Sequence, residues 1–181
     1  MHARVVAGAH AAVAEYGWAG ATLARIAEEA GVSRMTLHRH RLGREEIFQL
    51  LARAYEDDFR ASLAAAVDGP GSAADRLRRG LAAACASSER HLDFLRGLDD
   101  EADTRLFHVG GTSRAGFVAP IERVLRAGMR DGSFREVPVR STAMLLVNAA
   151  DRTYRHLRIA HGWTPARSRG AIDLLVRGLA P

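Results

Sequence analysis

The 181-residue chain lacks several features that mark whole classes of protein. It has a single cysteine, Cys85, which excludes an intrachain disulfide framework and any zinc or iron–sulfur site built from several cysteines. No apolar run approaches the roughly 18 residues of a membrane-spanning helix, so a transmembrane protein is excluded. The first residues do not form an apolar stretch ending in a signal-cleavage pattern. We therefore expect a cytoplasmic protein with no membrane partner.

Lysine is absent as well, since every basic residue is an arginine, and aromatic residues make up only 6% of the chain. No window alternates apolar and polar residues as a half-buried strand would. Alanine, leucine, arginine and glutamate are abundant, and these residues favour helix. Apolar residues reach 48%, which is enough for a packed core. The composition therefore predicts an all-α fold.

Apolar residues recur at helical spacing along the chain and predict about nine helices. Ser88 is expected to cap a short helix, and Pro120 to kink a helix or delay its start. The clearest linker is Asp68-Gly69-Pro70-Gly71, and Asp131-Gly132 is expected to make a turn. The expected helices lie near residues 5–17, 23–29, 34–40, 44–66, 77–85, 91–96, 113–130, 140–160 and 165–179.

The most informative segment runs from Thr22 to Arg44. A short helix, a three-residue turn and a second short helix together make a helix-turn-helix. Ala27 offers the small side chain that a close helix crossing needs, and Gly31 suits the left-handed conformation of the turn. Val32 and Leu37 are apolar and can both fill the space beneath the second helix. An ordinary helical hairpin is the alternative interpretation of these positions.

Positive charge is concentrated on the second of these helices and on its exit. The eleven residues from Arg34 to Arg44 include no acidic residue, whereas the first 65 residues balance eight arginines against eight acids. Such a focus of charge is what phosphate binding requires. A solvated basic face is the alternative. The basic residues of this segment are Arg34, His38, Arg39, His40, Arg41 and Arg44.

The segment TLARIAEEAGVSRMTLHRH, residues 22–40, resembles the DNA-binding region of the TetR/AcrR transcriptional regulators. The resemblance covers roughly residues 4 to 60, and the turn at residues 128–135 before the last two helices is also similar. It implies a helix-turn-helix domain over residues 1–47 and a ligand-binding and dimerisation domain over residues 48–181. The family usually has tyrosine at the position of His38 and phenylalanine at that of Arg41. We therefore expect a loosely packed N-terminal domain of modest DNA affinity.

The resemblance further implies that a homodimer places the helix from Arg34 to His40 in the major groove of a palindromic DNA operator. Arg34 can bond guanine O6 and N7 together, and Met35 can touch a thymine methyl group. Phosphate contacts are expected from Thr22, Thr36, His38 and Arg44. The complete set of predicted DNA-binding residues is Thr22, Ser33, Arg34, Met35, Thr36, His38, Arg39, His40 and Arg44.

A cavity in the second domain is also implied by the resemblance. Its candidate lining is largely apolar, which suits a small, mostly apolar effector that releases the DNA. His108 and Asn148 could orient the effector; the alternative is that most of the set is ordinary core. The candidate pocket residues are Phe59, Leu81, Cys85, His91, Phe94, Phe107, His108, Phe117, Ile121, Met144 and Asn148.

Two apolar stripes on the last two expected helices predict a four-helix dimer interface. The alternative is that these helices pack only within one subunit. The predicted interface residues are Ala143, Val147, Ala150, Tyr154, Leu157, Ala171, Leu174, Leu175 and Gly178.

No metal or cofactor is expected. His156 and His161 are five residues apart near a helix end, a spacing that we take to misalign their side chains. Catalytic triads, phosphate-binding glycine loops and cofactor fingerprints are missing, so we do not expect an enzyme. The sequence predicts a ligand-responsive DNA-binding repressor. The alternative is a helical interaction module that has lost specific DNA binding.

Overall fold

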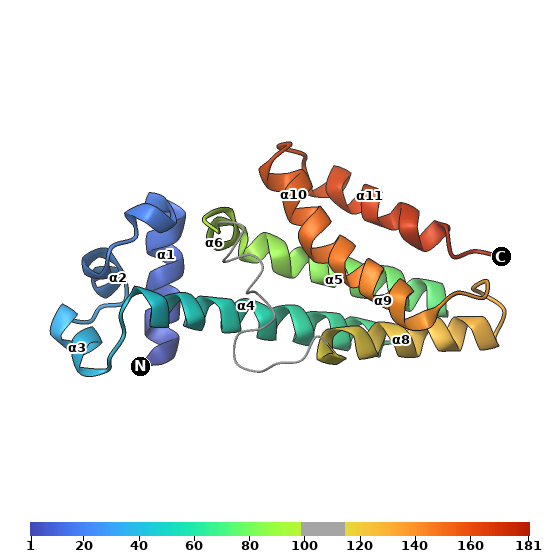
Figure 1. The fold of residues 1–181 in the computed structure, drawn as a ribbon, viewed down its shortest axis with the longest axis horizontal. Coiled ribbons are helices and arrows are strands. Elements are labelled where there is room, and N and C mark those ends of the chain that lie inside the picture. The colour runs from blue at the N-terminus through green and yellow to red at the C-terminus, as the bar shows by residue number, and fades with distance from the viewer. Residues whose placement is uncertain (99–114) are drawn as a thin grey trace. The chain divides into compact units, whose positions relative to one another are not determined.

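The computed structural model describes residues 1–98 and 115–181. These residues form helices and no strand, which confirms the all-α prediction (Figure 1). They fall into two compact units. Unit 1 holds Met1–Asp57 and residues 91–98, and unit 2 holds Asp58–Arg90 and residues 115–181. Both this division and the expected boundary at residue 47 fall inside the long helix α4 (Arg44–Val67).

Unit 1 is built from α1 (His2–Gly20), α2 (Leu23–Glu29), α3 (Arg34–Arg39), the first part of α4 and the short α6 (Leu92–Arg96). Helix α1 packs against both α2 and α6. Gly17 has a φ of +66° and interrupts the helical conformation within α1. The expected stop at Gly17 is therefore a break, after which the chain remains helical to Gly20.

Unit 2 contains the rest of α4 and α5 (Ala73–Arg90), α8 (Ala115–Arg130), α9 (Val139–Asn148), α10 (Tyr154–Ile159) and α11 (Pro165–Arg177). A π-helical turn, η2 (Ala149–Thr153), joins α9 to α10. Helix α5 packs against α8, α9, η2, α10 and α11, so it forms the centre of the unit. Among the described helices, none combines the length and the apolar character that a bilayer crossing requires.

Three local predictions in this part of the chain differ from the structure. Ser88 does not cap a new helix, because α5 continues to Arg90 and buries Ser88 completely. Pro120 lies inside α8 and does not delay its start. The helix expected over residues 140–160 is divided by η2 into α9 and α10.

The expected turn at Asp131-Gly132 is confirmed. The Asp131 carboxylate accepts hydrogen bonds from the backbone N–H (2.9 Å) and the hydroxyl (2.6 Å) of Ser133, which lower the pKa of Asp131. The Phe134 N–H donates to the Gly128 carbonyl oxygen at 2.9 Å. The Phe134 ring then occupies the space that a Gly128 side chain would fill. This turn connects α8 to α9 within unit 2.

Candidate nucleic-acid interface

Both helices of the helix-turn-helix begin at a hydroxyl cap. Thr22 Oγ1 accepts a hydrogen bond from the Arg25 N–H at 3.4 Å, at the start of α2. Ser33 Oγ accepts one from the Thr36 N–H at 3.0 Å, at the start of α3. Each cap satisfies one of the N–H groups that a helix leaves unpaired at its beginning. Local sequence therefore fixes where both helices begin.

The turn between α2 and α3 has the predicted geometry. Gly31 has a φ of +60°, the left-handed conformation that residues with a Cβ rarely adopt. The Val32 N–H donates to the Ala27 carbonyl oxygen at 2.9 Å and closes the end of α2. Ala27 and Leu37 are each only 2% exposed, which confirms both as buried contacts of the motif.

Two residues of α1 support this turn, and the sequence analysis missed both. A Cβ added to Gly8 would lie 2.4 Å from the backbone nitrogen of Ala30, so α1 crosses the end of α2 there at close range. The Arg4 guanidinium donates to the carbonyl oxygens of Ala30 (3.1 Å) and Gly31 (2.6 Å). A glycine inside a helical pattern was the available signal for the crossing.

Helix α3 is anchored by Leu37 and turns its other side chains outward. Arg34, Met35, His38 and Arg39 are exposed, and Met35 is 72% exposed although it is large and apolar. The hydroxyls of Thr36 and Ser33 lie 2.9 Å apart and bond each other. The exposed face therefore combines guanidinium groups, imidazoles and one thioether side chain.

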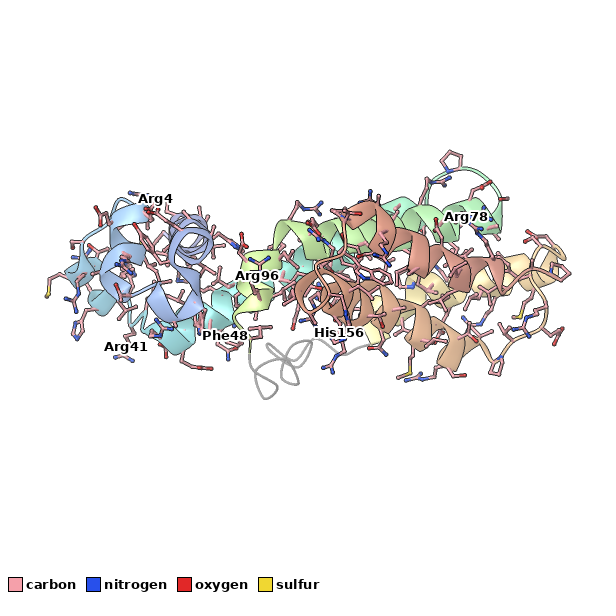
Figure 2. The ribbon with its side chains drawn as sticks, turned by 90° about the horizontal axis from the view of Figure 1, so that it is seen from above. Arg4, Arg41, Phe48, Arg78, Arg96 and His156 are labelled. Carbon is pink, nitrogen blue, oxygen red and sulfur yellow. The ribbon has the colours of Figure 1, made fainter. Side chains whose placement is uncertain are left out.

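After α3 the chain has an arginine where the family has a phenylalanine, and the next residue is a buried leucine. Arg41 is exposed and has a φ of +54°, so its side chain does not fill the place of the family's phenylalanine (Figure 2). Leu42 is buried instead, and its N–H donates to the Leu37 carbonyl oxygen at 2.9 Å. The buried apolar side chain between α3 and α4 is therefore Leu42, the residue after Arg41, and it was not predicted from the sequence.

Arg44 bonds to the protein's own backbone. Its Nη1 donates to the Ala21 carbonyl oxygen at 3.0 Å and its Nη2 to that of Trp18 at 2.9 Å. The guanidinium carbon also lies 4.7 Å from the centre of the Trp18 ring. These contacts join the start of α4 to Trp18 near the end of α1 and to Ala21, which follows that helix. They position the start of α4, and the phosphate contact that the resemblance implied for Arg44 stays a prediction.

An open cleft of about 640 Å³ lies beside α3. Within the described part of the chain, no carboxylate pairs with Arg34, Arg39 or Arg41, so the cleft carries uncompensated positive charge. Such a surface attracts anionic groups. The cleft is lined by Leu23, Arg34, Leu37, His38, Arg39, Arg41, Leu42 and Gly43.

The predicted pocket residues are distributed over both units. In unit 1, the His91 ring packs against His10, and the Phe94 ring against Phe48, with centroid separations of 4.9 and 5.6 Å. In unit 2, the rings of Phe59 and Phe117 lie 6.0 Å apart.

The remaining pocket candidates differ in burial and in what the structure describes. Leu81, Cys85 and Ile121 are buried, while Met144 and Asn148 are half-buried. Phe107 and His108 lie outside the described residues. Burial raises the pKa of the Cys85 thiol to about 12. The pocket as a set therefore stays a prediction.

The predicted dimer residues divide into an inner and an outer group. Ala143, Ala150 and Tyr154 are buried within unit 2, and the Tyr154 hydroxyl donates to Glu89 at 2.8 Å. Leu174 is 61% exposed. The outer and partly exposed members of the predicted set are Val147, Leu157, Ala171, Leu174, Leu175 and Gly178. The sequence analysis missed Leu145 of α9, which is 58% exposed.

The expectation that His156 and His161 are misaligned is wrong. Their Nε2 atoms lie 3.2 Å apart, because the chain turns back after α10. The residues that the structure describes include no cluster of three or more potential metal ligands.

The N-terminal unit and the whole fold both have known counterparts. Residues 5–51 match the family described as bacterial regulatory proteins, tetR family. No curated protein matches the chain. The chain has the fold of a TetR/AcrR-family regulator from Thermobifida fusca, with a TM-score of 0.76, 20% identity, and coverage of 99% of this chain and 98% of the other.

Two further solved structures share the fold at similar length. The TetR-family regulator PfmR of Thermus thermophilus has a TM-score of 0.70 and 21% identity, covering 98% of this chain and 100% of its own. The regulator FadR of Bacillus subtilis, in complex with stearoyl-CoA, has a TM-score of 0.73 and 17% identity, covering 98% and 99%. At these identities, the likeness establishes the fold.

Proposed function

We propose that the chain is a ligand-responsive repressor of the TetR/AcrR family of transcriptional regulators, whose family model matches residues 5–51 of its N-terminal unit. In this proposal a homodimer binds a palindromic operator, and a small, mostly apolar effector releases it. The protein is then a regulator and not an enzyme. The observation that carries the proposal is the exposed, uncompensated basic face of α3 on a helix-turn-helix with correct caps and turn.

We assign base recognition to the start of α3. Arg34 is exposed at the first position of the helix, from which a guanidinium can bond guanine O6 and N7 in the major groove. Met35 follows it and offers an apolar contact for a thymine methyl group. The remaining polar residues position the protein on the backbone of the duplex. These proposed backbone contacts are Thr22, Ser33, Thr36, His38, Arg39 and His40.

Dimerisation supplies the second recognition helix. One short helix reads few base pairs, so useful specificity needs two half-sites, spaced about 34–36 Å or one helical turn apart. The exposed leucines of α9 and α11, Leu145 and Leu174, support an interface on unit 2.

The effector proposal rests on the apolar character of the candidate pocket residues. The likeness to FadR of Bacillus subtilis in complex with stearoyl-CoA supports an apolar ligand class. To release DNA, the effector must bind more tightly to a conformation in which the recognition helices no longer fit the operator. Typical coupling of this kind is about 1–3 kcal/mol. Helix α4 contributes residues to both units and is the proposed route of coupling.

Selection of bound sequences from a random DNA pool by the purified protein tests the proposed function. A site with dyad symmetry is expected, and log affinity should fall steeply with log salt concentration, because several arginines per subunit displace counterions. Recovery of no symmetric site, together with salt-insensitive binding, would favour the alternative of an interaction module without specific DNA binding.

A further inference from the structure

The connection between α10 and α11 brings two imidazole rings together. The Nε2 atoms of His156 and His161 lie 3.2 Å apart, with ring centroids separated by 4.9 Å. Both side chains are exposed, so solvent reaches the pair. We propose that these two histidines form a binding site for a divalent late first-row transition metal ion, namely Zn²⁺, Ni²⁺ or Cu²⁺. This site is independent of the proposed DNA-binding function.

The separation of the two nitrogens fits a shared metal ion. Imidazole nitrogens bind such ions at about 2.0–2.1 Å. With Nε2 atoms 3.2 Å apart, the angle at the metal would be about 100–106°, between square-planar and tetrahedral values. In the metal-free protein one ring nitrogen donates a hydrogen bond to the other. A metal ion would take the place of that proton.

The turn that returns His161 to α10 is fixed by the backbone. Gly162 has a φ of +61°, a left-handed conformation that suits glycine. The Trp163 N–H then donates to the Leu157 carbonyl oxygen at 3.0 Å, which closes the turn over the last residues of α10. The two rings are therefore held close before any metal binds, so less conformational freedom is lost on binding.

A side-chain network supports the same turn. Arg158 donates to the Trp163 carbonyl oxygen and makes two hydrogen bonds to Glu89 of α5, at 2.8 and 2.6 Å. The Glu89 carboxylate compensates the charge of Arg158, which would otherwise oppose a nearby cation. The site is thus anchored to the central helix of unit 2 through Arg158.

The two imidazole ligands determine which metal ions the site would bind. Neutral imidazoles suit zinc, copper and nickel, whereas calcium and magnesium prefer oxygen ligands. Within the described residues no third potential ligand joins the pair, so water would complete the coordination. The site is therefore open and exchangeable, unlike the closed four-ligand sites that hold structural zinc.

Calorimetric titration of the full chain, produced without a histidine tag, with ZnCl₂ tests the proposal. We expect one zinc ion per chain. His156→Ala and His161→Ala should each weaken binding by about tenfold or more, since each removes one of two ligands. His2→Ala, which removes another exposed histidine, is the matched control and should leave zinc affinity unchanged. Unchanged circular dichroism of the metal-free variants would show that they remain folded.

Quenching of tryptophan fluorescence by Cu²⁺ gives a second readout. The Trp163 ring lies 6.5 Å from the His161 ring, close enough for bound copper to quench its emission. The quenching should disappear in Trp163→Phe and in His161→Ala. Failure of the wild type to bind zinc, or equal zinc affinity of the wild type and either histidine variant, would overturn the proposal.

Discussion

The guanidinium of Arg44 is bound by the carbonyl oxygens of Trp18 and Ala21, at 2.9 and 3.0 Å. A planar fork of N–H donors suits two separate acceptors, whereas a lysine ammonium is a compact point charge. The side chain therefore determines where α4 starts relative to the helix-turn-helix. Its influence on DNA binding would be exerted through the position of these helices.

Arg44→Ala should lower the free energy of unfolding by about 1–3 kcal/mol, because two partly buried carbonyl groups lose a charged donor. It should also weaken binding to all DNA sequences about equally. Arg44→Lys should recover only part of the stability. Urea unfolding monitored by circular dichroism measures the effect. Normal stability combined with a smaller salt dependence of DNA binding would instead make Arg44 a phosphate ligand.

Local chemistry explains which of these residues could be predicted from the sequence. Thr22, Ser33 and Gly31 act on backbone groups within a few positions of themselves, so their roles follow from the sequence. Arg44 reaches groups 23 and 26 residues earlier in the chain. Arg4 likewise reaches Gly31, 27 residues later. Nothing in a local pattern specifies such distant partners.

The crossing of α1 over the end of α2 depends on the absence of a side chain at Gly8. The nearest atoms to a Cβ at that position would be backbone atoms of Ala30, at 2.4 and 2.7 Å. Backbone atoms cannot move aside as the end of a flexible side chain can. The small residue therefore sets how closely the two helices approach.

Gly8→Ala should destabilise unit 1 by about 1–3 kcal/mol, because the added methyl group overpacks the crossing. Gly170→Ala is the matched control. That glycine is exposed in α11 with no atom within 4 Å of an added Cβ, so alanine should stabilise by about 0.5–1 kcal/mol. Denaturant unfolding of both variants measures these changes. Equal effects of the two substitutions would show that the crossing tolerates a side chain.

Glu89 links two helices of unit 2. Its carboxylate accepts hydrogen bonds from Arg158 and Tyr154 of α10. The hydrogen bonds from Arg158 are the largest cause of the lowered pKa of Glu89. A carboxyl group whose pKa is lower in the folded state stabilises the fold above its unfolded pKa. That contribution is lost as the pH falls through the folded pKa.

Glu89→Gln should therefore destabilise the protein at about pH 7, and the difference from the wild type should shrink as the pH falls below the ordinary glutamate pKa of about 4.3 and through the lowered pKa of folded Glu89, so that this group becomes protonated in both states. Thermal unfolding across this pH range measures the difference. The difference between the two proteins isolates Glu89 from other carboxylates. A difference independent of pH would mean that the charge of Glu89 does not contribute.

The helix expected over residues 140–160 is interrupted by η2, and the spacing of apolar residues cannot predict such an interruption. Apolar residues at steps of three and four continue through η2, so the pattern does not reveal a π-helical turn. The buried ion pair between Asp151 and Arg155, 2.8 Å apart, lies where the π-helical turn meets α10. The histidine pair was missed for a related reason, since helical spacing does not describe a chain that turns back at Gly162.

At the scale of the molecule, two of the most exposed large apolar side chains among the described residues lie on α9 and α11 of unit 2. Leu145 and Leu174 are 58% and 61% exposed, while their neighbours Leu146 and Val176 are buried. The buried residues form the core of the unit, and the exposed leucines remain available for a second copy of the chain. The apolar stripes predicted from the sequence included buried residues such as Ala143 as well as the exposed Leu174. Helical spacing alone does not tell which apolar residues face the subunit's own core.

Leu174→Asp should yield a folded monomer. The side chain is exposed within one chain, so the substitution leaves the core intact, but a dimer would bury an unpaired carboxylate at a cost of several kcal/mol. Sedimentation velocity measures the oligomeric state. Ala14→Asp, at an exposed residue of α1, introduces the same charge in unit 1 and should leave the dimer unchanged. A stable dimer of Leu174→Asp would place the interface elsewhere.

The proposal that α3 reads DNA bases through Arg34 is tested by the base preference of an Arg34→Ala variant on the operator selected by the wild type. We expect the variant to lose preference at one position in each half-site, at a cost of about 1–3 kcal/mol there. Arg53→Ala, which removes an exposed arginine of α4, should keep the wild-type preference. Full retention of base preference by Arg34→Ala would contradict the claim.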